Sequence, residues 1–214
     1  MNSLRTRLAR TFSWVLVLAC TAGTTQAQSA TKNLGGGWQV FIPDINVVDV
    51  VRDNTAAGGG TLVIQKFAVI SDFSVLDLIF SQIGTNAQTA TRIAITDELV
   101  FNNTTGQNWT GFNIGLVNQV NGSATYNTAA STTQSFTPFT TRTYSGGNTL
   151  VSYSGGVVPV GTFWTPGNLS GALWIDIALN PADTRNTRVA FTLREQAVPG
   201  TGAAVTLQIT TTIE

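Results

Sequence analysis

The chain has 214 residues, of which 43% are hydrophobic and only 10% are charged, and eleven basic residues balance eleven acidic ones. Because it has no histidine and a single cysteine, Ser-His-Asp and Cys-His triads, internal disulfides and cysteine-based zinc sites are excluded. The balanced charge creates no strong field that would favour nucleic acid or an anionic membrane. The 34 Thr and 16 Asn favour β structure and turns.

The N-terminus, residues 1–27, is predicted to be a secretory signal peptide. Three arginines within residues 5–10 precede an apolar segment, 12–19, that is too short to span a bilayer. The small residues at 25 and 27 fit a signal-peptidase site, with cleavage after Ala27. Cleavage leaves eight basic and eleven acidic residues, a net charge of −3 over 187 residues. We therefore expect a secreted, periplasmic or cell-surface protein.

Cys20 offers an alternative processing site. Residues 17–20 (VLAC) are similar to a bacterial lipoprotein box, in which the cysteine becomes the acylated first residue. The bulky Leu18 departs from that pattern, so cleavage after Ala27 is the main prediction.

After a flexible entry segment at 28–37 (QSATKNLGGG), residues 38–214 are predicted to form one β-sandwich domain. Short apolar runs of period two alternate with Gly, Asn, Asp and Pro, as expected for antiparallel sheets with one solvated face. An amphipathic helix over 71–81 is the alternative to a strand there. The sequence thus predicts an all-β, antiparallel sandwich of jelly-roll or immunoglobulin-like type with about ten strands. The expected strands cover 38–42, 45–52, 61–70, 74–80, 93–101, 112–116, 133–143, 149–153, 173–179, 188–194 and 205–210.

The stretch 121–148 is rich in Thr, Ser, Gly and Asn and carries spaced aromatic residues. It is interpreted as a pair of edge strands with a loose hairpin. The alternative is a functional loop that presents its aromatic side chains, because long irregular connections are often functional.

Oxygen atoms are the only protein ligands left for a metal, which restricts the candidates to calcium and magnesium. The densest oxygen cluster is Asp44, Asn46, Asp49 and Asp53. Its apolar neighbours favour a strand, and it lacks the D-x-D-x-D-G loop. No cofactor and no bound metal are predicted, with a structural calcium as the alternative.

A carboxylate pair is the remaining enzymatic hypothesis. The separation of Glu98 and Glu195 along the chain resembles that of the acid pair in secreted jelly-roll xylanases. This resemblance would imply that the two glutamates catalyse glycoside hydrolysis. Their contexts, TDELV and LREQA, do not match those enzymes, and charged residues on strands are usually solvated. The main prediction is a non-enzymatic protein.

Residues 95–112 consist of a strand, an Asn-Asn-Thr-Thr-Gly turn at 102–106 and a second strand opened by Trp109. This segment resembles one found in secreted β-sandwich proteins of Gram-negative bacteria, many of them sorted by the exosortase system. The resemblance implies an extracellular or cell-surface role without enzymatic activity. The chain lacks the Pro-Glu-Pro motif of the sorted members, which favours release or periplasmic retention over anchoring.

Three functions follow from these observations. The first is surface interaction as an envelope or extracellular matrix component. The second is carbohydrate binding, in which exposed aromatic faces stack on sugar rings and Asn and Thr bond to hydroxyl groups. The third is self-association through an edge strand at 206–213. For carbohydrate binding, we expect Trp164 to be the most exposed platform and Trp174 to face solvent beside Asp176. The candidate platforms are Trp109, Trp164, Trp174, Tyr126, Tyr144 and Tyr153.

Overall fold

The computed structural model describes residues 27–55, 60–119, 121–167 and 171–200, and for 52–55 and 97–102 it describes the backbone alone. The signal peptide, Cys20 and the strand expected at 205–210, which includes most of the proposed edge strand, lie outside the described residues. The described chain forms two sheets of β-strands with three short 3-10 helices, which confirms the predicted all-β sandwich. None of the helices in these ranges has the length and apolar character needed to cross a membrane.

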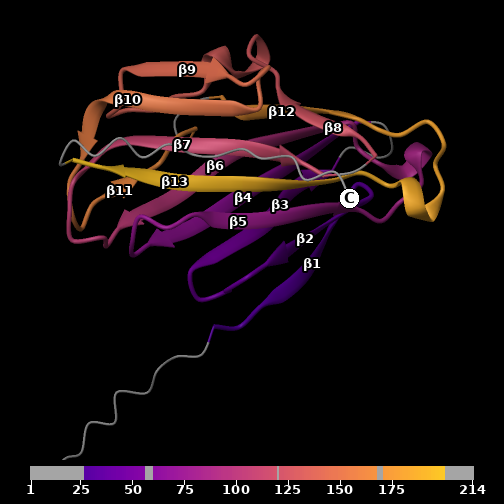
Figure 1. Cartoon of the computed structure of the whole chain (residues 1–214), viewed down its shortest axis with the longest axis horizontal. Helices are drawn as coiled ribbons and strands as arrows, with labels where there is room; N and C mark the ends of the chain where they lie inside the picture. The colour runs from indigo at the N-terminus through magenta and orange to yellow at the C-terminus, as the bar shows by residue number, and fades with distance from the viewer. Residues whose placement is uncertain (1–26, 56–59, 120, 168–170, 201–214) are drawn as a thin grey trace, which may run out of the picture.

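Sheet A has seven strands in the order β1-β2-β5-β13-β7-β10-β9, and sheet B has the order β3-β4-β6-β12-β8 with β11 beside β6. Figure 1 shows β1 and β2 at one side of the sandwich and β9 and β10 at the opposite side. The strands of sheet A are β1 (Ala30–Gly35), β2 (Trp38–Ile42), β5 (Leu76–Gln82), β7 (Trp109–Asn118), β9 (Thr141–Ser145), β10 (Leu150–Val158) and β13 (Ala190–Pro199). The strands of sheet B are β3 (Val48–Thr55), β4 (Thr61–Ile70), β6 (Arg92–Asn103), β8 (Ser123–Tyr126), β11 (Phe163–Trp164) and β12 (Leu173–Ala178). The 3-10 helices are η1 (Asn86–Gln88), η2 (Ala130–Thr133) and η3 (Arg185–Thr187).

Two stretches differ from the prediction. Residues 30–35, expected within a flexible entry segment, instead form β1, which pairs with β2 through backbone hydrogen bonds that need no apolar side chains. Of the strand expected at 133–143, only the end belongs to β9, and most of the remainder is irregular. The strand prediction near 71–81 is confirmed by β5, and the helical alternative there is wrong.

The antiparallel pattern has one exception, because β4 and β6 are parallel neighbours in sheet B. The chain leaves sheet B after β4, returns along sheet A as β5 and re-enters sheet B as β6. Two changes of sheet restore the original strand direction, which produces the parallel pair. The sandwich is therefore mixed rather than purely antiparallel.

Both open sides of the sandwich are bridged. At one side, Lys32 of the edge strand β1 forms an ion pair with Asp49 of the edge strand β3. At the other, residues 127–140 cross from the edge strand β8 of sheet B to the edge strand β9 of sheet A. The two edge strands expected in 121–148 are thus present, but they belong to different sheets and do not form a hairpin.

The crossing segment lies over a cluster of aromatic side chains centred on Trp164. The Trp164 ring lies 5.0 Å from Phe112, 5.0 Å from Phe139 and 5.1 Å from Tyr153, measured between centroids. Its Nε1 donates a hydrogen bond of 3.2 Å to the carbonyl of Phe136. Trp164 therefore packs as a core residue that ties the crossing segment to sheet B.

Replacing Trp164 with Ala is expected to lower the free energy of unfolding by about 3–5 kcal/mol, because it leaves a large cavity in the core. The matched control is Phe163→Ala on the same strand, where a side chain that is 60% exposed should cost no more than about 0.5 kcal/mol. Chemical denaturation followed by circular dichroism measures both. Equal losses for the two variants would contradict the burial assigned to Trp164.

Candidate functional site

The predicted aromatic platforms do not form one site. Trp109 and Trp164 are 0% exposed, and Tyr126 and Tyr153 are almost as deeply buried. The expectation that Trp164 faces solvent is wrong, since its parity within β11 directs it inward and leaves Phe163 exposed. Only Trp174 and Tyr144 keep part of their surface in solvent.

Tyr144 lies at the edge of sheet A, away from the outer face that carries Trp174. Its ring packs 6.0 Å from Tyr126, and the Arg142 guanidinium carbon lies 5.5 Å from its centroid. The Tyr144 hydroxyl is buried, and among the described residues it has no hydrogen-bond partner. Tyr144 therefore contributes more to closing the sandwich than to an exposed platform.

Trp174 lies on the outer face of sheet B, as its shared parity with Asp176 predicts. The strand register places it opposite Ala94 of β6, and Ala94 opposite Val63 of β4. Ala94 is only 1% exposed, so neighbouring side chains cover it. The Arg92 guanidinium carbon lies 5.7 Å from the ring centroid of Trp174, which is within the range of a cation–π contact.

The backbone of Trp174 is held from one side by the crossing segment. Its N–H donates a 2.9 Å hydrogen bond to the Ser131 hydroxyl, and its carbonyl accepts one of 2.9 Å from the N–H of Asn127. The indole is therefore attached to a backbone that is fixed by both sheet pairing and the crossover.

A chain of polar side chains lies next to the indole. Arg92 Nε donates to Asp176 Oδ1 at 2.7 Å, and Asn127 Nδ2 donates to Asp176 Oδ2 at 2.7 Å. Arg92 and Asp176 nevertheless keep about two fifths of their side-chain surface in solvent. They line a hollow of about 400 Å³, together with Gly60, Thr61, Thr91 and Ile177. An exposed indole thus adjoins a hollow that offers both donors and acceptors.

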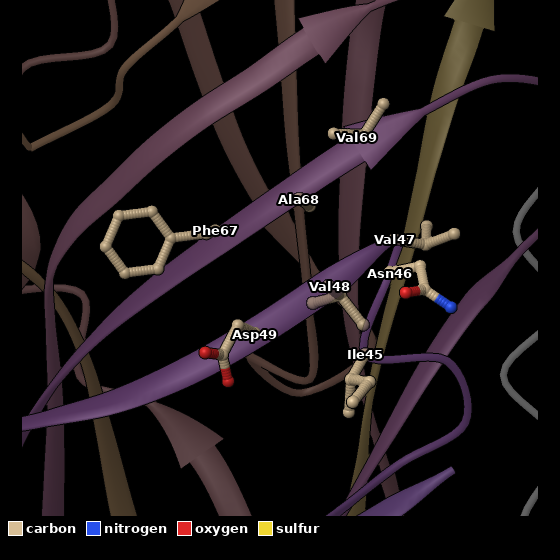
Figure 2. A pocket seen from close by; sticks show the side chains of 8 residues that line it. All are labelled: Ile45, Asn46, Val47, Val48, Asp49, Phe67, Ala68 and Val69. Carbon is tan, nitrogen blue, oxygen red and sulfur yellow. The ribbon is translucent and has the colours of Figure 1, made fainter. Parts of the chain in front are cut away.

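A second depression on the same sheet is apolar. Figure 2 shows it over the neighbouring strands β3 and β4, where Phe67 and Val69 project from β4, and Ile45 and Val47 come from the turn that precedes β3. Its volume is about 220 Å³, and Asp49 at its rim is already paired with Lys32. Val63 and Phe67 have the same parity on β4, so this depression and Trp174 share the outer face of sheet B.

One member of the predicted carboxylate pair, Glu195, is not accessible to a substrate. Glu195 is 0% exposed and its Oε2 accepts a 2.7 Å hydrogen bond from Lys66 Nζ of the opposite sheet. Burial raises the pKa of Glu195, and the nearby charge of Lys66 opposes that rise. The side chain of Glu98 lies outside the described residues, although its backbone is paired with that of Lys66.

Lys66 was not among the functional residues predicted from the sequence. The alternation along β4 could have identified it, because Lys66 has the same parity as the inward residues Ile64 and Ala68. A lysine at an apolar parity within a strand predicts a buried partner.

The described members of the oxygen cluster near Asp44 do not assemble a metal site. Asp44 Oδ1 accepts hydrogen bonds of 2.9 and 3.0 Å from the backbone and side chain of Asn46, and Asp49 pairs with Lys32. Within the described part of the chain, no three His, Cys, Asp or Glu side chains come together as metal ligands. The side chain of Asp53 is outside that part.

Comparison with known proteins found no matching family model, no matching curated protein and no matching solved structure.

Trp174 is the only partly exposed tryptophan among the described residues, so it should dominate quenching of tryptophan fluorescence by acrylamide. In protein that begins at Gln28, and so lacks Trp14, Trp174→Phe is expected to remove most of the quenchable emission. Trp109→Phe serves as the control and should leave the quenching constant almost unchanged. Quenching that persists in the Trp174→Phe variant would contradict the exposure of this indole.

Proposed function

We propose that this protein is an exported, non-catalytic β-sandwich that binds saccharide chains through the outer face of sheet B. The observation that carries the proposal is the partly exposed indole of Trp174 beside the hydrogen-bonded chain of Arg92, Asp176 and Asn127. This combines the two predicted functions, surface interaction and carbohydrate binding, at one place on the molecule.

The chemistry of the hollow suits a neutral, hydroxyl-rich ligand. A sugar ring stacks its C–H face on an indole, while its hydroxyl groups bond to neighbouring polar side chains. Asp176 supplies acceptor oxygens and Arg92 supplies N–H donors, and both remain partly open to solvent. Thr61 and Thr91 line the same hollow and add hydroxyl groups.

The arrangement favours binding over hydrolysis. Glycoside hydrolysis uses two carboxyl groups on either side of the scissile bond. Among the residues that line this hollow, Asp176 is the only carboxylate, and both of its oxygens already accept hydrogen bonds. Glu195, one member of the predicted acid pair, is fully buried between the sheets.

The proposed location outside the cytoplasm rests on residues 1–27 and on the resemblance of residues 95–112 to exported β-sandwich proteins. An envelope or matrix environment would supply polysaccharide as the ligand. This part of the proposal stands apart from the geometry of Trp174 and is tested by the N-terminal sequence of the exported protein.

A glycan array is expected to identify a bound saccharide, and calorimetry with that saccharide should give a Kd that rises at least about tenfold in Trp174→Ala, because the variant loses the stacking surface. Asp176→Asn should also weaken binding, since it removes a charged acceptor beside the sugar.

The matched control is Phe163→Ala, which removes the most exposed large hydrophobic side chain of the described chain at a different place. It should leave the Kd unchanged. An array without any bound saccharide, or equal affinities of wild type and Trp174→Ala, would overturn the proposed function.

A further inference from the structure

In the described part of the chain, the two sheets are joined in their interior by a contact between two charged side chains. Lys66 Nζ of β4 lies 2.7 Å from Glu195 Oε2 of β13, and the two residues are 129 positions apart in the chain. Both side chains are 0% exposed. No other charged side chain in the described part of the chain is fully buried.

The described neighbours of this contact along the inner faces of β4 and β13 are apolar. On sheet B, Lys66 shares the inner face with Ile64 and Ala68, and on sheet A Glu195 shares it with Leu193 and Ala197. Transfer of an ammonium and a carboxylate into such surroundings is costly, and the mutual attraction repays it only when the remaining polar atoms are also bonded. Glu195 Oε1 is buried and has no hydrogen-bond partner among the described residues. As an ion, the Glu195 carboxylate is therefore incompletely compensated.

Burial favours the uncharged form of Glu195, because it raises the pKa of this carboxyl group. A neutral lysine amine is a nucleophile, and a protonated carboxyl group is an electrophile. Because the two sheets hold the groups in contact, the reaction does not lose the translational and rotational entropy of bringing two reactants together.

We propose that Lys66 and Glu195 condense to form an intramolecular isopeptide bond between sheet B and sheet A. Lys66 Nζ forms a bond to Glu195 Cδ, and the bond between Cδ and one carboxyl oxygen breaks. That oxygen leaves as water with two of the three ammonium hydrogens, so that the atoms and charges balance without any oxidant or activating reagent. The product is a neutral secondary amide, which removes two buried charges at once.

The bond would supply a covalent link that the chain cannot form by other means. Because the whole sequence contains one cysteine, an internal disulfide is not available to an exported form of this protein. The amide would join two strands from opposite sheets and constrain the long segment between them. This inference does not depend on saccharide binding at Trp174.

The experiment is mass spectrometry of the folded full-length protein and, where it is exported, of its processed form. The intact mass is expected to be about 18 Da below that of the corresponding sequence, because one water is lost. After denaturation and digestion with trypsin, cleavage should fail at Lys66 but proceed at Lys32. The digest should contain residues 53–92 joined to residues 195–214 as one branched peptide.

Lys66→Arg is the matched control, because it keeps the positive charge and cannot form the amide. It should have the full sequence mass and release residues 195–214 as a linear peptide. A dehydrated linear peptide 195–214 does not support the proposal, since an N-terminal glutamate can cyclise after digestion. Wild-type protein with the full sequence mass and normal cleavage at Lys66 would overturn the isopeptide bond, whether or not the variant folds.

Discussion

The constraint on which this structure depends is that two sheets share one interior, so inward side chains are mostly apolar and buried polar groups need partners. The chain changes sheet repeatedly to enclose this interior, and β13 lies at the centre of sheet A between β5 and β7. Lys66 and Glu195 are the charged exceptions among the described residues, and they lie against each other. Replacing Lys66 with an uncharged residue would remove the described partner of the buried Glu195 carboxylate, which is strongly destabilising.

Period-two hydrophobicity predicts the strands well where one face is buried, as at 38–42 and 61–70, which match β2 and β4. It fails for β1, because an edge strand held by backbone hydrogen bonds needs few apolar side chains. Leu34 is the only fully buried residue of that strand. The parallel pairing of β4 with β6 was also beyond prediction, since it depends on where β5 is placed and not on the composition of either strand.

The candidate site was predictable only in part, for a similar reason. Trp174 belongs to a strand long enough to show alternation of apolar and polar residues. Its outward position follows from that of Asp176, which lies two positions later. Phe163 and Trp164 form a strand of two residues, which has no measurable period, so the sequence cannot decide which ring faces inward. Arg92 and Asn127 come from distant segments, and only the register of β6 with β12 and the crossing segment bring them to Asp176.

The two faces of sheet B thus have different roles, although the same strands form both. On the inner face, Lys66 of β4 joins the sheet to its partner, and on the outer face Trp174 of β12 adjoins the polar hollow. A binding platform gains affinity when its side chains are ordered before the ligand arrives, because less entropy is lost on binding. The hydrogen bonds of Trp174 with the Ser131 hydroxyl and the Asn127 N–H fix its backbone, and pairing with β6 and β8 fixes the strand itself. A rigid interior and a preorganised surface are therefore two consequences of the same packing.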